Sequence, residues 1–173
     1  IMALSHLLRY SLMSNDEQVP LSREVRIVDE YYSIYHVRFG ERVRMEWRIS
    51  DSLDLTETMV PSFILQPIVE NAVKHGLEYE EEDGKGHIRI ECRGEDEFIV
   101  FRVINNGGAI DLQKVAEVMR TPGTGYGIYN ICERIELYYG PGSGLFPSIT
   151  EDGETCFTLK LNRTLGKETP PEA

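Results

Sequence analysis

Residues 61–77 constrain the fold of this chain more than any other segment. If they form a helix with about 100° between successive residues, their side chains divide into two opposed faces. The apolar face consists of Leu65, Ile68, Val69, Ala72 and Val73. The polar face consists of Glu70, Asn71, Lys74 and His75. The first face can seal a hydrophobic core, which leaves the second face to solvent or to a ligand.

The polar face of this segment has two interpretations. Most amphipathic helices are polar on one side only because water is there. Asn71, however, is a poor helix former in the middle of the segment, and such a residue needs a reason to be there. A hard cation such as Mg²⁺, bound by few protein oxygens and by substrate phosphates, would supply that reason. The sequence therefore favours a site for metal and polyphosphate on this face.

The charge balance excludes some classes of partner. The 173 residues carry a formal net charge of -11, whereas nucleic-acid-binding proteins usually carry a basic stripe. We therefore expect no nucleic-acid partner. No stretch of roughly 18 apolar residues is present, so nothing in this sequence is expected to span a membrane. Cys92, Cys132 and Cys156 form no metal or redox motif, and we expect reduced, buried thiols.

The beginning of the chain has helical periodicity. Residues 1–14 are predicted to form one helix and residues 22–39 a second one, with Ser22 as its N-cap and Gly40 as its stop. Two helices joined by a short loop form a hairpin, which buries little by itself. We expect residues 1–42 to form part of a dimerisation hairpin that packs on a second copy. The alternative is that both helices pack on the domain that follows.

The period then changes to that of strands. Residues 43–50, 87–93 and 98–105 are predicted strands, and the last is apolar on both faces, which indicates a central position. Asp111 is expected to cap a helix that reaches Arg120, a helix is predicted over 128–139, and a hairpin follows. These elements predict an α+β fold: a two-layer α/β sandwich in residues 43–163, with helices on one face of a sheet. Residues 164–173 are expected to be a disordered tail.

A glycine-rich loop precedes the helix over 128–139. Gly123, Gly125 and Gly127 allow the backbone to approach a ligand closely, and the helix that follows offers free N–H groups at its start. Together they favour an anion site, although a plain flexible turn is the alternative. Asn105, Asn106 and Gly107 end the central strand; they indicate either a tight turn or a group that reads an exocyclic amine of a base.

These segments, in this order, resemble the ATP-binding domain of sensor histidine kinases, within the GHKL (Bergerat) superfamily of gyrase, Hsp90, histidine kinases and MutL. Leu65–Gly76 and Gly125–Ile135 are similar to the LytS-type family. Further upstream, Leu7–Ser11, Val19–Glu24 and Tyr31–Ile34 resemble the dimerisation helices of that family. The similarity covers nearly the whole chain except the tail.

The resemblance implies a role for each motif. Asn71 would ligate Mg²⁺, Lys74 and His75 would face the phosphates of ATP, and Glu70 would assist metal binding or proton transfer. The remaining nucleotide contacts would come from Asn105, Gly107, Gly123, Gly125, Gly127, Ile128 and Thr155. The family transfers the γ-phosphoryl group to a histidine and then to a response regulator, often one with a LytTR DNA-binding domain. The chain would be the cytoplasmic part of a homodimeric, membrane-anchored bacterial protein.

Two departures from the family pattern affect these expectations. Asn105 occupies the position of an aspartate in the family. An uncharged amide accepts a weaker hydrogen bond from the adenine amine, which would lower the binding free energy by about 1 kcal/mol. Ala109 replaces a glycine of the same block. The phosphoacceptor histidine is expected upstream of Leu4, and His6 is in the wrong block. We therefore expect weakened ATP binding and no autophosphorylation by this fragment alone. The alternatives are a non-catalytic nucleotide-sensing or scaffold module, and a serine kinase of the anti-sigma type on the same fold.

Overall fold

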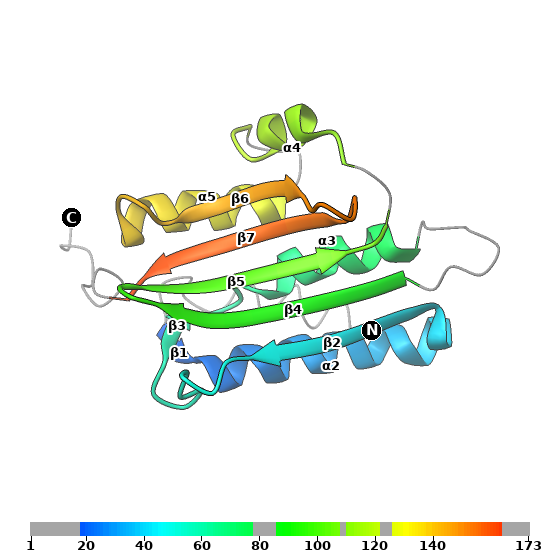
Figure 1. The fold of residues 1–173 in the computed structure, drawn as a ribbon, viewed down its shortest axis with the longest axis horizontal. Helices are drawn as coiled ribbons and strands as arrows, with labels where there is room; N and C mark the ends of the chain where they lie inside the picture. Colours follow the sequence, from blue (N-terminus) through cyan, green and yellow to red (C-terminus); the bar gives the residue numbers. More distant parts are fainter. Residues whose placement is uncertain (1–17, 78–85, 108–109, 122–125, 164–173) are drawn as a thin grey trace.

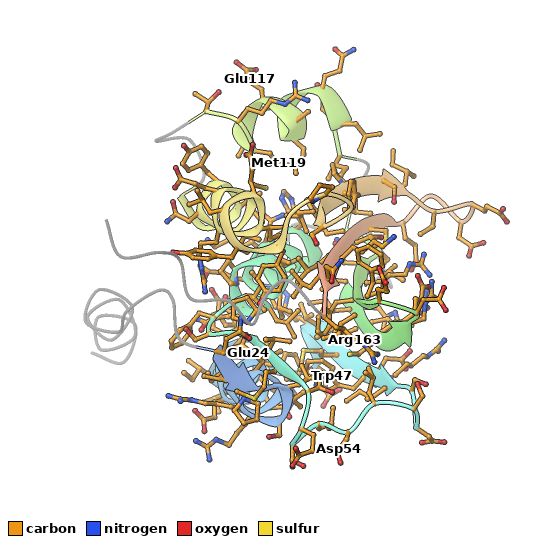
Figure 2. All side chains as sticks on the ribbon, turned by 90° about the vertical axis from the view of Figure 1, so that its left-hand side faces the viewer. Glu24, Trp47, Asp54, Glu117, Met119 and Arg163 are labelled. Carbon is orange, nitrogen blue, oxygen red and sulfur yellow. The ribbon has the colours of Figure 1, made fainter. Side chains whose placement is uncertain are left out.

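The computed structural model describes residues 18–77, 86–107, 110–121 and 126–163. A five-stranded sheet has the order β2-β4-β5-β7-β6, and helices α2, α3 and α5 cover one of its faces (Figures 1 and 2). The strands are β2 (Val43–Ile49), β4 (Gly86–Glu95), β5 (Phe98–Asn105), β6 (Gly144–Ile149) and β7 (Thr155–Asn162). The helices are α2 (Leu21–Phe39), α3 (Gln66–Leu77), α4 (Leu112–Val118) and α5 (Tyr126–Tyr139), with a 3₁₀ turn η1 at Gly40–Arg42. The predicted α+β two-layer sandwich is confirmed.

Several predicted segments cannot be compared with the structure. The first helix, over 1–14, the tail from 164, and both Gly123 and Gly125 lie outside the described residues. In the part of the chain that is described, no helix is both long enough and apolar enough to cross a bilayer.

Strand β5 is the central strand, as its two apolar faces predicted. It pairs antiparallel with β4 on one side and with β7 on the other. Because side chains alternate along a strand, Phe101 points to the helical layer, whereas Val100 and Ile104 of the same strand point to the opposite face. All three are at most 3% exposed. Phe101 belongs to the hydrophobic core that α2, α3 and α5 share with the sheet.

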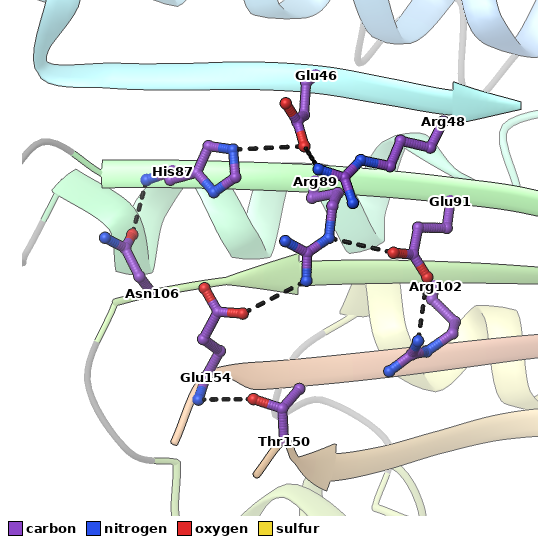
Figure 3. A network of polar contacts seen from close by, with 9 residues as sticks. All are labelled: Glu46, Arg48, His87, Arg89, Glu91, Arg102, Asn106, Thr150 and Glu154. Atoms are coloured by element: carbon purple, nitrogen blue, oxygen red, sulfur yellow. Dashed lines mark hydrogen bonds and ion pairs between the residues drawn. The ribbon is translucent and has the colours of Figure 1, made fainter. Parts of the chain in front are cut away.

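The face of the sheet away from the helices carries a network of charged side chains (Figure 3). Arg89 contacts Glu91 at 3.1 Å and Glu154 at 3.5 Å, and Arg102 contacts Glu91 at 3.0 Å. No described helix covers this face, so the long side chains of the network shield the apolar residues of β5 from water. The charged side chains thus cover the face of the sheet on which no described helix packs.

Helix α2 packs on the same core as α3. Val28 is fully buried, Trp47 Nε1 donates to Asp29 Oδ1 at 2.8 Å, and the Tyr32 hydroxyl donates to the Val43 carbonyl at 2.7 Å. The helix ends at Gly40, as predicted, with a φ of 61° that favours glycine. The described part of this segment, α2, packs on the following domain, and dimerisation through residues 1–42 stays a prediction.

Two predicted helix starts are wrong. Ser22 is not the N-cap of α2, because the backbone N–H groups of Leu21 and Ser22 donate to the carbonyls of Thr58 and Leu55, both at 2.8 Å. A side-chain cap is therefore not needed there. Helix α3 begins at Gln66 and not at residue 61.

The residues before α3 form a strand that the sequence did not predict. Strand β3 (Met59–Pro61) pairs antiparallel with β1 (Gln18–Pro20) in a small second sheet. The pairing aligns Val19 with Val60 and brings the starts of α2 and α3 together. In the main sheet β2 runs parallel to β4 while the other pairs are antiparallel, so the sheet is mixed.

The cysteines are unbridged, as predicted, but only two of the three are fully buried. Cys92 and Cys156 are buried, Cys132 is half-buried, and all three are free. Burial raises the pKa of Cys92 to about 12 and that of Cys132 to about 11. Both thiols therefore stay protonated near neutral pH.

The central position of Phe101 predicts a large effect on stability. Phe101→Ala should lower the free energy of unfolding by about 3–5 kcal/mol, because it removes a fully buried ring and leaves a cavity. Phe146→Ala on edge strand β6 is the matched control, since that ring is 50% exposed and should cost less than about 1 kcal/mol. Urea unfolding of both variants measures the difference; equal losses would contradict the assignment of the core.

Candidate functional site

Helix α3 seals the core with one face, as predicted. Ile68, Val69 and Val73 are fully buried, and Ala72 is 2% exposed. Residues of the opposite face are half-buried or exposed. The helix lies against β4 and β5, so its polar face is held at a fixed distance from the sheet.

Glu70 and Lys74 on this face bind each other. Lys74 Nζ lies 2.9 Å from Glu70 Oε1, one helical turn away. This contact is the main reason that the pKa of Lys74 is raised. The pKa of Tyr31 on α2 is also raised, first by burial, then by the neighbouring Tyr35 hydroxyl and then by the charge of Glu70. The Glu70–Lys74 pair is therefore next to the tyrosines of α2.

Asn71 and His75 follow Glu70 and Lys74 by one residue, so they are rotated by about 100° around the helix axis. Both are half-buried. The Asn71 amide makes no hydrogen bond with the residues that the structure describes. Its oxygen is a ligand of the type that Mg²⁺ accepts, and the amide is accessible for such a contact.

Asn105 and Thr155 are brought together by the sheet. They are directly paired across β5 and β7, and each is 1% exposed. Strand alternation places Asn105 on the helical side, in line with Val103 and Phe101. Its Nδ2 donates to the Gly107 carbonyl at 3.4 Å, while the next residue, Asn106, accepts from the His87 N–H at 2.6 Å. This end of β5 is thus a fixed turn facing the helical layer.

The start of α5 packs closely on the start of α3. A Cβ atom added to Gly127 would lie 3.0 Å from Cβ of Pro67, so any side chain at this position would push the proline ring away by a few tenths of an ångström. Ile128 is half-buried beside it and packs against the core. Helix α5 begins at Tyr126, two residues before the predicted start. Asp111 caps α4 as predicted, accepting from the N–H groups of Gln113 and Lys114 at 3.0 and 3.2 Å.

A cavity of about 230 Å³ lies elsewhere in the molecule. Its lining residues are Gln18, Glu57, Thr58, Met59, Ile99, Tyr139, Asn162 and Arg163. Ile99 is near the beginning of β5 whereas Asn105 ends that strand, so this cavity is at the opposite end of the sheet. It is therefore separate from the predicted site residues.

The sequence analysis missed two side chains that hold the segment before α3. Glu24 of α2 is fully buried and accepts from the N–H of Phe63 at 2.6 Å and of Leu65 at 3.1 Å. Arg134 of α5 donates to the Ser62 carbonyl at 2.9 Å. A signal for Glu24 was present, since a carboxylate occurs at the helical spacing of buried residues in α2.

Comparison with known proteins agrees with this arrangement. Residues 61–165 match the family of histidine kinase-, DNA gyrase B- and HSP90-like ATPases, and residues 1–43 match the histidine kinase family. The sensor protein LytS of Streptococcus mutans is 32% identical over 163 residues, which are 91% of this chain and 27% of that protein. The sensor histidine kinase YpdA of Escherichia coli is 30% identical over 145 residues, 82% of this chain and 25% of YpdA.

Solved structures share the fold at low sequence identity. The histidine kinase ThkA in complex with the response regulator protein TrrA has a TM-score of 0.65 at 17% identity, over 95% of this chain and 47% of ThkA. The histidine kinase AdeS of Acinetobacter baumannii has a TM-score of 0.64 at 13% identity, over 92% of this chain and 73% of that one.

The segment over 61–165 is thus a domain of the ATP-binding type. The chain belongs to the family of histidine kinase-, DNA gyrase B- and HSP90-like ATPases, and sensor histidine kinases of the LytS type are among its relatives. It spans about a quarter of the length of the relatives it matches.

The contact between Gly127 and Pro67 predicts that a larger residue would separate the two helices. Gly127→Val should lower the free energy of unfolding by about 1–3 kcal/mol, because the proline ring cannot rotate away. Glu136→Val is the control, since it adds a β-branched residue at an exposed position of the same helix. Thermal unfolding of both variants gives the measurement, and a loss for Gly127→Val no greater than that for Glu136→Val would contradict a tight contact at Pro67.

Proposed function

We propose that this chain binds Mg-ATP between α3, the end of β5 and the start of α5, and holds the γ-phosphoryl group for transfer to a histidine outside the domain. The observation that carries the proposal is the convergence of these elements within the segment that matches the ATPase family. Phosphoryl transfer needs little covalent chemistry from the protein. Positioning and charge neutralisation are therefore the tasks assigned to the residues of the site.

Asn71 is the proposed protein ligand of Mg²⁺. Its accessible amide supplies one oxygen, and Mg²⁺ usually completes its shell with phosphates and water. No group of three His, Cys, Asp or Glu gathers within the described residues, which fits an ion that depends on the nucleotide for most ligands. The bound metal would neutralise charge on the phosphates.

The phosphates are proposed to lie near His75, Lys74 and the start of α5. The N–H groups at the start of a helix, with its partial positive charge, attract anions. Glycines at 123, 125 and 127 would let the backbone approach them. Glu70 Oε1 lies 2.9 Å from Lys74 Nζ, so the proposed role of Glu70 in metal binding or proton transfer requires a change of that pair.

The base is proposed to lie against Asn105, Gly107 and Thr155. The two buried polar side chains are paired across the strands and face the helical layer, where an adenine amine could donate to a side-chain oxygen. An amide oxygen accepts such a bond without the charge of an aspartate.

The partners of the whole protein are also proposals. ThkA, which shares the fold, forms a complex with a response regulator, and this supports a response regulator as the acceptor downstream of the histidine. The resemblance of the motifs to the LytS-type family leads us to propose a regulator of the LytTR type, a homodimer formed through the segment before β2, and membrane anchoring of the full-length protein, with this chain on the cytoplasmic side.

Removal of the proposed metal ligand gives the first test of function. Asn71→Ala should weaken Mg-ATP binding about tenfold, since it removes an oxygen contact with a cation. Affinity for ATP in EDTA should stay nearly unchanged, and Asn71→Asp should bind more tightly than the alanine variant. Isothermal titration calorimetry provides the constants. An equal loss with and without Mg²⁺ would exclude a role in metal binding.

Asn105→Asp tests whether the base contact functions in its present form. Because Asn105 already offers an oxygen acceptor and the missing charge is worth only about 1 kcal/mol, the affinity for Mg-ATP should rise by no more than about fivefold. The change also removes the donor to the Gly107 carbonyl, so the unliganded protein should be less stable. Calorimetry with ATP and thermal unfolding separate the two effects. A gain above about tenfold would favour the degenerate, non-catalytic module instead.

A further inference from the structure

Glu24 connects two elements that are far apart in the sequence. It is buried on the inward side of α2, and Figure 2 labels it within the helical layer. Its two carboxylate oxygens accept from Phe63 and Leu65, which are 39 and 41 residues further along the chain. The side chain is fully buried, so these bonds are made without competition from water.

The Glu24 carboxylate accepts hydrogen bonds from backbone N–H groups just before the start of α3. Leu65 has no polar side chain to cap the helix, yet its carbonyl accepts from the N–H groups of Ile68 and Val69, both at 3.1 Å. Its own N–H is held by Glu24. Phe63 takes a φ of 57°, an uncommon conformation for a residue with a side chain. A carboxylate from another helix thus holds the turn that sets where α3 begins.

The surroundings of Glu24 favour a fixed position of this turn. Pairing of β1 with β3 aligns the two segments just before Glu24 and Phe63, and Arg134 binds the Ser62 carbonyl from the side of α5. Burial raises the pKa of Glu24, while the backbone N–H groups of Leu65, Phe63 and Ile64, and then the charge of Arg134, act in the opposite direction. The carboxylate is therefore surrounded by donors suited to its charged form.

We propose that Glu24 is a positioning residue for nucleotide binding: it fixes the first turn of α3 against α2, and through α3 it places Asn71 and the contact of Pro67 with Gly127. This inference rests on the proposed nucleotide site. It adds that a residue of the segment matched by the histidine kinase family, outside the ATPase segment, controls the affinity for ATP. Movement of α2 would then alter the site directly.

Two substitutions separate positioning from general stability. Glu24→Gln keeps the shape of the side chain, but its NH₂ group opposes one of the two backbone donors. Val28→Ala, one turn further along α2, leaves a cavity in the same core and touches no polar group of the turn. Both variants should lower the melting temperature. Glu24→Asp keeps the charge on a shorter side chain and should restore part of the function.

The experiment measures Mg-ATP affinity by calorimetry on the 173-residue chain, together with amide hydrogen exchange. Glu24→Gln should weaken binding about tenfold and speed exchange at Phe63 and Leu65, whereas Val28→Ala should leave the affinity within about twofold. Glu24→Asp should fall between Glu24→Gln and the native chain, and it decides the question if Glu24→Gln does not fold.

The possible failures are distinguishable. If the native chain does not bind Mg-ATP, the proposed function fails and this inference fails with it. If the native chain binds and Glu24→Gln binds equally well, only this inference is overturned. Equal losses of affinity in Glu24→Gln and Val28→Ala would likewise show that Glu24 contributes stability alone.

Discussion

The burial of one face of α3 against β4 and β5 is the constraint on which the rest of the structure depends. Ile68, Val69 and Val73 lose all contact with water there, and a fully buried side chain of this kind contributes about 1.5–3 kcal/mol. Rotation of the helix would expose them. The same burial therefore fixes the direction in which Asn71 points, and it makes the geometry of the proposed metal site a consequence of hydrophobic packing.

The proposed nucleotide site is formed around this helix by segments that precede and follow it in the sequence. The sheet pairs Asn105 with Thr155 across 50 residues of chain, and Gly127 allows α5 to approach α3 at Pro67. Glu24 holds the turn before α3 from a different segment. Each of these contacts is between elements that are remote in sequence. Displacement of any of them would change the shape of the proposed nucleotide site.

Local patterns predicted much of this arrangement correctly. The alternation in β2, the two apolar faces of β5, the stop at Gly40 and the cap at Asp111 all rest on interactions within a few residues, and the structure confirms them. The wrong predictions share another cause. Ser22 was expected to cap α2, but carbonyls of the loop before β3 satisfy those N–H groups. Three-residue strands such as β1 and β3 have too little periodicity to be recognised.

The sequence by itself determined which residues of α3 face the core, which strand is central and which motifs belong to an ATP-binding family, because these follow from side-chain period and residue type. Only the tertiary structure decided where α3 begins, that β2 runs parallel to β4, that Lys74 binds Glu70 and that Glu24 is buried under Phe63 and Leu65. These outcomes depend on which remote donors and acceptors meet in space. No pattern within a single segment contains that information.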